Sequence, residues 1–257
     1  QESLPYKWMS SVSRRIYSRA DRIAVTSPLF DEYFSSSLSL NREPSDYLPQ
    51  YADDNFGMVG TSGGCDGYDP TKVNLTFAGN VGQAQSVATI VRAASLCNND
   101  RIVFHVVGSG SKLEDCKRLA ETLKAKNVVF HGRKPIEKMP RYYAASSAML
   151  VTFEDSPMAT YTLPRKVTTY LAAGKPVLAA LSGETKRVLD EAHCGLCCAI
   201  EDAKGLARIC DEFVERDDKD LMGKNARSYY ESHFSKEMFF DKLESILKEL
   251  AGENNNG

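Results

Sequence analysis

Between residues 73 and 181 the chain alternates short apolar runs with segments whose apolar residues recur at helical spacing. The apolar runs predict buried strands at residues 73–78, 102–107, 128–131, 148–153 and 177–181. The intervening segments predict helices near 87–94, 113–123, 136–146 and 164–173. Apolar strands that alternate with amphipathic helices are typical of a parallel sheet covered on both faces. We therefore expect an α/β fold with a doubly wound, Rossmann-like parallel sheet.

The regions before and after this alternation have other patterns. After residue 181 the chain is expected to be mainly helical, with apolar stripes at 206–213 and 239–250. Before it, residues 10–20 predict a basic helix, 22–26 a short strand, 27–34 a helix and 47–51 extended chain. Residues 57–70 are rich in glycine and predict a linker. The expected organisation is the end of an N-terminal lobe with a crossover (1–56), a linker (57–70), a ligand-binding domain (71–251) and a disordered tail (252–257).

Composition excludes some classes of function. The 257 residues are 42% hydrophobic and have a formal net charge of -2, so no strong field favours nucleic acid. No apolar run approaches the roughly 20 residues that cross a bilayer. The sequence has seven cysteines, most of them expected to be small buried side chains in a reduced, cytosolic protein. Cys194, Cys197 and Cys198 lack the second ligand pair of a zinc site, and no metal is expected.

The first candidate for chemistry is the turn Gly79-Asn80-Val81-Gly82, which follows the first strand and is expected to lead into a helix. Free backbone N–H groups and the positive end of the helix dipole favour a phosphate there. A glycine turn that only redirects the chain remains the alternative. The turn departs from G-x-G-x-x-G, and no acidic residue closes the second strand, which argues against an NAD-dependent dehydrogenase.

The second candidate is the segment LPRKVTTYLAAGKP at residues 163–176, with Pro164 in the first turn of a helix and Gly174 after its end. Lys166 and Thr169 are three residues apart, on one face of this helix near its N-terminus. A cation and a hydroxyl in that place suit a diphosphate and a ribose. The alternative is that Lys166 is a solvated surface lysine.

Several segments, in the expected order, resemble family 4 glycosyltransferases of the GT-B fold. LPRKVTTYLAAGKPVLA is similar to that family's P-S-K-x-x-(E/T)-Y-x-A-x-G-K-P motif, and FAGNVGQAQ to G-N-L-G-x-A-Q, with a match at Gln85. VVFHGRKPIEKMPRYYAASSAMLV and GKNARSYYESHFSKEMFFDKLESIL match later segments, while YSRADRIAVTSPLFDEY and YLPQYAD resemble the end of the acceptor-binding domain. The likeness is to the bacterial branch that builds capsule, O-antigen and colanic-acid-like polysaccharides.

This resemblance implies a retaining enzyme whose C-terminal domain binds a nucleotide-sugar donor without a metal or other cofactor. Gly79 to Gly82 and Lys166 would stabilise the leaving diphosphate. Residues 132–135 would cradle the base, and Arg133 would reach the phosphates. The implied acceptor is a glycan or polyprenyl-linked sugar at the cytoplasmic face of the membrane. The basic helix is compatible with peripheral membrane contact through Arg14, Arg15, Arg19 and Arg22, although a solvated face is the simpler interpretation.

The sequence departs from the family pattern at three places. Thr169 stands where many members have the ribose-binding glutamate of an E-x7-E pair. Val81 and Gln83 stand near positions where many members have an arginine and a lysine. Arg165 replaces the usual serine and is expected to face solvent, with a compensating positive charge as the alternative. Donor binding is therefore expected with an altered ribose contact.

The catalytic residues are not assigned, because the resemblance places them in the N-terminal domain. His105, His131, His193 and His233 are expected to be structural, and the Asn74-Leu75-Thr76 sequon is expected to be buried and unmodified. This chain alone is expected to bind donor without transferring it. Two other functions stay open: a degenerate, non-catalytic binding module, and a GT-B-type nucleotide-sugar epimerase or phosphorylase. The sequence does not identify the sugar, the base, the acceptor or the oligomeric state.

Overall fold

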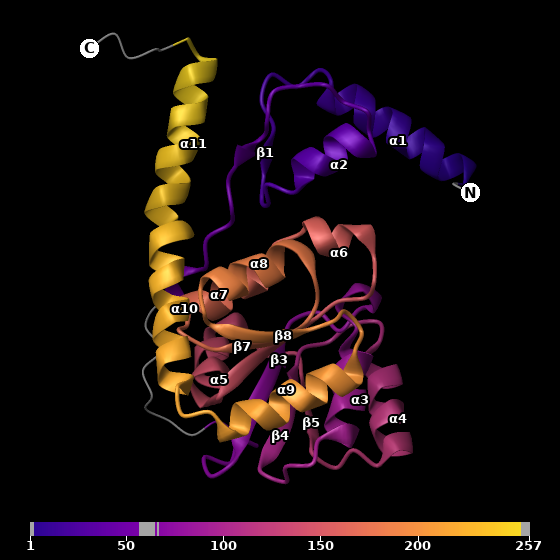
Figure 1. Cartoon of the computed structure of the whole chain (residues 1–257), viewed down its shortest axis with the longest axis vertical. Coiled ribbons are helices and arrows are strands. Elements are labelled where there is room, and N and C mark those ends of the chain that lie inside the picture. The colour runs from indigo at the N-terminus through magenta and orange to yellow at the C-terminus, as the bar shows by residue number, and fades with distance from the viewer. Residues whose placement is uncertain (1–2, 57–64, 66, 253–257) are drawn as a thin grey trace.

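A computed structural model describes residues 3–56, 65 and 67–252 of the chain. The bulk of it is an α/β body, above which a smaller N-terminal part lies in Figure 1. The central sheet consists of β3 (Val73–Ala78), β4 (Ile102–Val107), β5 (Val128–Gly132), β6 (Ala148–Thr152), β7 (Val177–Ala180) and β8 (Gly195–Cys198). Its strand order is β5-β4-β3-β6-β7-β8, and every neighbouring pair is parallel. The order reverses between β3 and β6, which is where open α/β sheets bind ligands.

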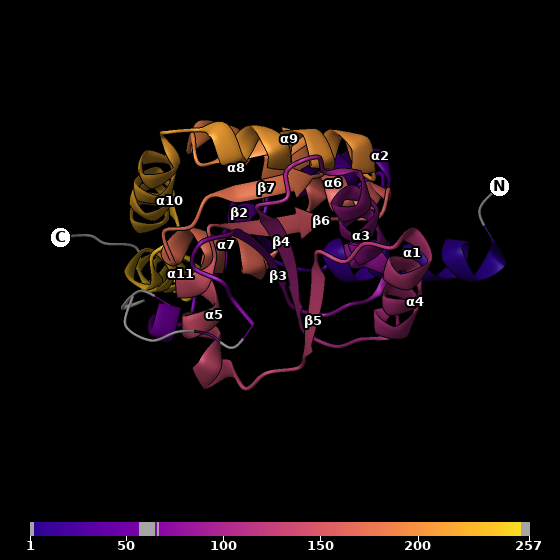
Figure 2. The same cartoon turned by 90° about the horizontal axis from the view of Figure 1, so that it is seen from below.

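Helices cover both faces of this sheet, as expected. They are α3 (Val87–Leu96), α4 (Leu113–Leu123), α5 (Met139–Ala145), α7 (Arg165–Ala172), α8 (Gly183–Glu191) and α9 (Ala203–Glu215). Figure 2 shows α3 and α4 on one side of the strands and α5 and α7 on the other. Two separate apolar clusters result. One joins Ile90 of α3 and Phe213 of α9 to the sheet, and the other joins Tyr143 of α5 and Tyr170 of α7 to it.

Some predicted boundaries are wrong. The strand β8 lies in a region predicted to be mainly helical, because its four half-buried residues give no long apolar run. A short helix, α6 (Pro157–Tyr161), lies in a predicted loop. The helix expected over 136–146 is divided into a 3₁₀ turn, η3 (Ile136–Lys138), and α5. The basic N-terminal helix, α1, covers Leu4–Tyr17 and so begins six residues before the predicted start.

The N-terminal part contains α1, β1 (Ala24–Val25), α2 (Phe30–Ser36), β2 (Asp46–Tyr47) and the 3₁₀ turn η1 (Asp54–Phe56). The strands β1 and β2 are parallel, and Phe34 and Leu38 are buried in a small cluster beside them. After α10 (Lys219–His233), the long helix α11 (Lys236–Leu250) runs back along one side of the molecule to this part (Figure 1). There Arg22 bonds both Asp46 and Glu249, so its charge does not belong to a free basic face.

The proposed domain boundaries stay predictions. Most of the linker at 57–70 lies outside the described residues, and so do residues 253–257 of the tail. Within the described ranges, no helix is both long enough and apolar enough to cross a bilayer. Several apolar side chains of α1 are exposed, including Leu4, Trp8 and Ile16.

Candidate functional site

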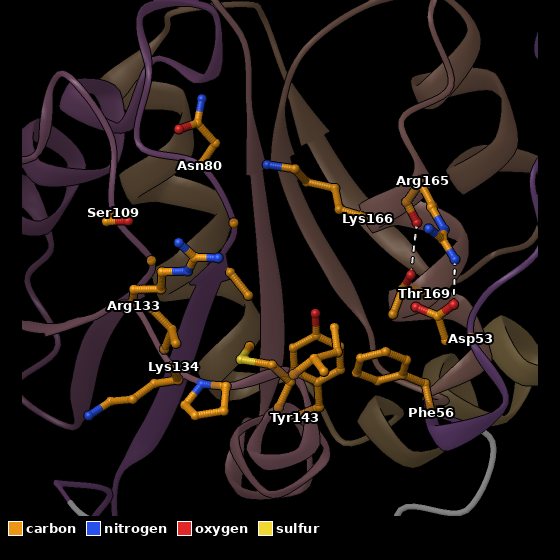
Figure 3. A pocket seen from close by; sticks show the side chains of 17 residues that line it. Asp53, Phe56, Asn80, Ser109, Arg133, Lys134, Tyr143, Arg165, Lys166 and Thr169 are labelled. Carbon is orange, nitrogen blue, oxygen red and sulfur yellow. Dashed lines mark hydrogen bonds and ion pairs between the residues drawn. The ribbon is translucent and has the colours of Figure 1, made fainter.

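A cavity of about 940 Å³ opens at the carboxyl ends of β3, β4 and β5 (Figure 3). Its walls come from the turns after these three strands, from the first turns of α7, and from residues 53–56 of the crossover. The lining residues are Asp53, Phe56, Ala78, Gly79, Asn80, Val107, Gly108, Ser109, Arg133, Lys134, Pro135, Ile136, Met139, Tyr143, Arg165, Lys166 and Thr169. The cavity therefore contains five of the eight predicted site residues: Gly79, Asn80, Arg133, Lys166 and Thr169.

The glycine turn after β3 packs directly against the turn after β4. A Cβ atom on Gly108, whose φ is +152°, would lie 1.8 Å from the carbonyl oxygen of Gly79. The N–H of Gly79 donates to Val107 O, and the N–H of Val81 donates to Ser109 O, both at 2.9 Å. The prediction of free N–H groups is thus wrong for these two residues, because the neighbouring turn occupies them. In the described part of the chain, the N–H groups of Asn80 and Gly82 donate to no protein acceptor.

The glycine turn does not lead straight into a helix, contrary to the prediction. A 3₁₀ turn, η2 (Gln83–Gln85), and Ser86 in a left-handed conformation come before α3 begins at Val87. Gln85 accepts a hydrogen bond from the Asn80 amide at 3.2 Å, and its carbonyl accepts one from Thr152 at 2.6 Å. Gln85 therefore stabilises the glycine turn from outside the cavity. Val81, Gly82 and Gln85 lie outside the cavity lining, with Val81 fully buried in the core.

Lys166, on the first turn of α7, points across the cavity toward the glycine turn that carries Asn80 (Figure 3). Its ammonium nitrogen is buried and makes no hydrogen bond in the part of the chain that the structure describes. It lies 4.2 Å from the centre of the Phe77 ring, and 3.4 Å from where a Cβ of Gly79 would stand. Burial lowers the pKa of this lysine to about 8. Lys166 is therefore not a solvated surface lysine, and among the described residues its buried charge has no counter-ion.

Thr169 and Arg165 lie one turn apart on α7. The Thr169 hydroxyl donates to the carbonyl of Arg165 at 2.9 Å, so its hydrogen is used within the helix. The Arg165 guanidinium donates to the Asp53 carboxylate at 2.5 Å, and both side chains are about half exposed. Arg165 is exposed, as expected, and its side chain also lines the cavity, where it pairs with Asp53 of the crossover.

An aromatic surface forms one end of the cavity, close to the loop after β5. Phe56 stacks on Tyr143 with ring centres 5.1 Å apart. Gly132, whose φ is +66°, turns the chain at the end of β5. Arg133 and Lys134, which follow it, line the wall of the cavity opposite Lys166 and Arg165 (Figure 3). Sequence reasoning missed Asp53, Phe56 and Tyr143. Tyr143 falls within a predicted helix and looks like a core residue, while Asp53 and Phe56 belong to a segment without periodicity.

The histidines of the sheet are structural, as expected. His105 is fully buried and bonds the Asn74 side chain through Nε2 and His131 through Nδ1, both at 2.9 Å. Tyr68 stacks on the His105 ring at 3.7 Å. Asn74, the first residue of the sequon, is buried in β3, which confirms that it is inaccessible. The network ties β3, β4 and β5 together below the cavity.

The lysine of the Gly174-Lys175-Pro176 segment also has a structural role. Its ammonium donates to the carbonyls of Ala144 and Ser146, at 3.1 and 2.8 Å, and so satisfies the end of α5. The motif therefore combines one ligand-facing lysine, Lys166, with one that fixes the packing of α5.

Comparison with known proteins identifies the family. Residues 72–216 match the family described as "Glycosyl transferases group 1". The chain belongs to this family. Over 180 residues it is 31% identical to the probable glycosyltransferase WbjE of Pseudomonas aeruginosa, in an alignment that covers 69% of this chain and 44% of WbjE. Over 100 residues it is 24% identical to WcaI of Escherichia coli (strain K12), a putative colanic acid biosynthesis glycosyl transferase, covering 39% of this chain and 24% of WcaI. The chain thus spans less than half the length of both relatives.

Solved structures of glycosyltransferases share the fold. Anabaena HepE, in a complex with UDP and glucose, superposes with a TM-score of 0.76 at 16% identity, covering 94% of this chain and 66% of that one. A glycosyltransferase from Rickettsia africae superposes with a TM-score of 0.78 at 14% identity, covering 100% and 69%. These likenesses confirm the predicted GT-B-type α/β fold.

No group of three or more metal-binding side chains occurs among the residues that the structure describes. Cys194 and Cys210 are buried, as expected for small apolar side chains, while Cys197 and Cys198 belong to β8. Metal independence of this chain stays a prediction.

Proposed function

We propose that the whole protein is a retaining glycosyltransferase of polysaccharide biosynthesis, and that this chain holds its nucleotide-sugar donor. The ammonium of Lys166, which is buried beside Gly79 and has no hydrogen-bond partner in the described part of the chain, carries the proposal, since it marks where a diphosphate would neutralise a charge. The structures of Anabaena HepE with UDP and with UDP-glucose support a nucleoside diphosphate as the ligand. The name of the relative WcaI, a putative colanic acid biosynthesis glycosyl transferase, supports a glycan acceptor, while a polyprenyl-linked acceptor rests on the motif resemblance alone.

In this proposal the cavity acts on the leaving group. The bond between the anomeric carbon and the diphosphate breaks, and negative charge grows on the terminal phosphate. Lys166 stabilises that charge from a site with little water, where electrostatic stabilisation is strongest, and Arg133 adds a second positive charge from the opposite wall. The acceptor hydroxyl then attacks from the face that the diphosphate leaves. Retention is supported by the motif resemblance, and no catalytic residue is assigned to this chain.

Calorimetry with UDP, GDP, dTDP and ADP tests the donor site. We expect saturable binding of at least one of them at millimolar concentration or below, and a loss of at least about tenfold in affinity for Lys166→Ala. Lys186→Ala is the matched control, because Lys186 lies on the exposed face of α8 and pairs only with Asp190. The donor site is refuted if none of the four nucleotides binds. An unchanged affinity in Lys166→Ala would move the diphosphate elsewhere.

The metal requirement is tested in the same experiment. We propose that the lysine and arginine charges of the cavity serve where other enzymes use a divalent cation. Binding and transfer are then expected to persist in EDTA. A loss that Mg²⁺ or Mn²⁺ restores would contradict metal independence without contradicting the donor site.

Transfer itself needs the full-length protein and its acceptor, and this chain alone is expected only to bind. NMR of the product of the full-length protein should show the anomeric configuration of the donor, whereas an inverted product would contradict retention. Donor binding without any transfer would favour the degenerate binding module. Conversion of the donor sugar into its epimer would favour the epimerase.

Peripheral contact with the inner face of the cell membrane is also part of the proposal. The helix α1 exposes Leu4, Trp8 and Ile16, with Arg14 and Arg15 on the same helix. Such a combination suits the interface of an anionic bilayer. Sedimentation with phosphatidylglycerol vesicles should recover the protein, and recovery should fall for Trp8→Ser. If the wild type stays in the supernatant, the membrane contact is wrong.

A further inference from the structure

The charges around the cavity are distributed unevenly. Of the 17 described residues that line it, four are cations, namely Arg133, Lys134, Arg165 and Lys166, and Asp53 is the single carboxylate. A carboxylate in a site for a diphosphate repels the phosphates, so its place in the cavity has to serve another part of the ligand. In Figure 3, Asp53 lies beside Arg165 on the side opposite Asn80 and Ser109.

Asp53 is held in place on both sides. Just before it, the N–H of Ala52 donates to the hydroxyl of Tyr230 at 3.2 Å. Just after it, Phe56 stacks on Tyr143, and the Phe56 N–H donates to the Asp53 carbonyl at 3.1 Å. The side chain is fixed by Arg165, which donates to Oδ1. An exposed ion pair contributes little stability, so the effect of Arg165 is to aim the carboxylate.

The second oxygen of the carboxylate is available to a ligand. Within the described ranges of the chain, Oδ2 of Asp53 accepts no hydrogen bond. On α7, one turn after Arg165, Thr169 also lines the cavity, but its hydroxyl hydrogen is already donated to the Arg165 carbonyl. Thr169 therefore offers a ligand only a neutral acceptor. Asp53 is the stronger acceptor, and its bonds to a ligand hydroxyl would be charge-assisted.

A nucleotide has one group that such an acceptor fits. The ribose carries two neighbouring hydroxyl donors, and nucleotide-binding sites hold them with a carboxylate. With the phosphates beside Lys166 and the glycine turn, as in the proposed function, a ribose joined to them would fall between that turn and the aromatic surface of Phe56 and Tyr143. Asp53 is the lining carboxylate on that side.

We propose that Asp53 accepts a hydrogen bond from a ribose hydroxyl and makes the site select ribonucleotides over deoxyribonucleotides. This inference rests on the proposed function, because it needs a nucleoside diphosphate in the cavity. It assigns the ribose contact to the crossover segment rather than to α7, where Thr169 stands. The crossover segment would then contact the nucleotide directly, through Asp53.

The test compares three ligands on each variant of the chain. They are the tightest binder among UDP, GDP, CDP and ADP, and its 2′-deoxy and 3′-deoxy forms. The wild type should bind the ribonucleotide about tenfold more tightly than at least one deoxy form. In Asp53→Asn this ratio should fall to about threefold or less, because the amide oxygen accepts only a neutral hydrogen bond, whatever happens to the absolute affinity when Arg165 loses its partner. Asp54→Asn is the matched control, since Asp54 pairs with Lys236 and lies outside the lining, and it should keep the wild-type ratio.

The outcomes separate the two proposals. If no nucleoside diphosphate binds, the proposed function fails first. If the nucleotides bind and Lys166→Ala weakens them, but Asp53→Asn keeps the wild-type ratio, the donor site stands and the assignment of Asp53 is wrong. A wild type that prefers dTDP to UDP, or that binds ribo and deoxy forms equally, also overturns it. Thermal unfolding of each variant checks that the fold stays intact, as expected for Asp53 because its side chain is half exposed.

Discussion

The hydroxyl of Tyr170 makes two hydrogen bonds to the backbone of Ala78, at the end of β3. It accepts a hydrogen bond from the N–H of Ala78 at 3.2 Å and donates one to the carbonyl of the same residue at 3.0 Å. Tyr170 is fully buried and lies one turn after Lys166 on α7, while Ala78 comes directly before Gly79. One phenol therefore fixes the distance between the lysine and the glycine turn that together form the proposed diphosphate site.

Tyr170→Phe is expected to destabilise the protein by about 2–3 kcal/mol, because two buried backbone groups lose their partner at once. Urea denaturation measures this change in the free energy of unfolding. Tyr143→Phe is the matched control. Tyr143 is also buried but makes no hydrogen bond among the described residues, so its loss should cost less than about 1 kcal/mol. If the two variants lost the same free energy of unfolding, the hydrogen bonds of Tyr170 to Ala78 would not be what stabilises this junction.

The parts of the fold that could be predicted are those whose residues face the same environment along a whole element. The runs at 73–78 and 102–107 are buried on both faces and match β3 and β4 residue for residue. The strand β8 could not be predicted, since its four residues, GLCC, include no β-branched or aromatic side chain, whereas the equally half-buried edge strand β5 begins with Val128-Val129-Phe130. The left-handed Ser86, which separates the glycine turn from α3, was equally unpredictable because a serine in that conformation is uncommon.

The candidate site likewise contains residues that could be predicted from the sequence and residues that could not. Lys166 and Gly79 could be found because each belongs to a local motif, and the fold brings the motifs together at the switch point of the sheet. Asp53 could not be found, because its position depends on Arg165, which is 112 residues further along the chain. The occupied N–H groups of Gly79 and Val81 were missed for a similar reason. Their acceptors lie on the next strand and turn, which a local reading of the first turn does not include.

Lys166→Met is expected to stabilise the ligand-free protein while weakening nucleotide binding. Burial lowers the pKa of Lys166 from 10.5 to about 8, so at pH 7 the folded state holds a charge that the unfolded state solvates better. The lowered pKa corresponds to a cost of about 3–4 kcal/mol for that charge, part of which the contact with the Phe77 ring offsets. We expect a gain of about 2 kcal/mol in the free energy of unfolding at pH 7, and at least about a tenfold loss of affinity for the nucleoside diphosphate.

The pH dependence of this gain follows from the same shift. Because the folded pKa is the lower one, the destabilising charge is fully present below pH 8 and disappears as pH rises toward 10.5. The difference in stability between Lys166→Met and the wild type should therefore shrink between pH 8 and pH 10. Urea denaturation at several pH values measures it, with Lys186→Met as the surface control. A difference that stays constant with pH would mean that the ammonium is solvated.

Gly108→Ala is expected to separate the two turns that form the floor of the cavity. Its Cβ would lie 1.8 Å from the Gly79 carbonyl oxygen, a backbone atom that cannot move aside by rotating a side chain. We expect a destabilisation of at least about 3 kcal/mol and loss of nucleotide binding. Gly132→Ala is the control, since Gly132 also has a positive φ but nothing within 4 Å of its added Cβ. Strain alone should cost that variant about 1–2 kcal/mol. If Gly108→Ala and Gly132→Ala destabilise the protein equally, the close approach of the two turns is not the reason that position 108 needs a glycine.

Acid should weaken the sheet below the cavity through His105. Burial first, and the neighbouring His131 second, lower the pKa of His105 from 6.5 to about 3. Its neutral ring is held between Asn74 and His131 and covered by Tyr68, so protonation is favoured only after unfolding. The stability that depends on the neutral ring is complete above pH 6.5 and is lost as pH falls toward 3, by at most about 1.4 kcal/mol per pH unit.

The variant His105→Gln isolates this contribution, because glutamine keeps a donor for Asn74 and carries no charge at any pH. At pH 7 we expect it to be less stable than the wild type, since it loses the stacking of Tyr68 on the imidazole. Between pH 6.5 and pH 4.5 the wild type should lose stability faster than the variant, so that the two curves converge. His233→Gln, at the exposed end of α10, controls for the removal of a surface histidine. Parallel curves for His105→Gln and the wild type would show that the buried ring accepts a proton without unfolding, and that the three-strand network tolerates a charge.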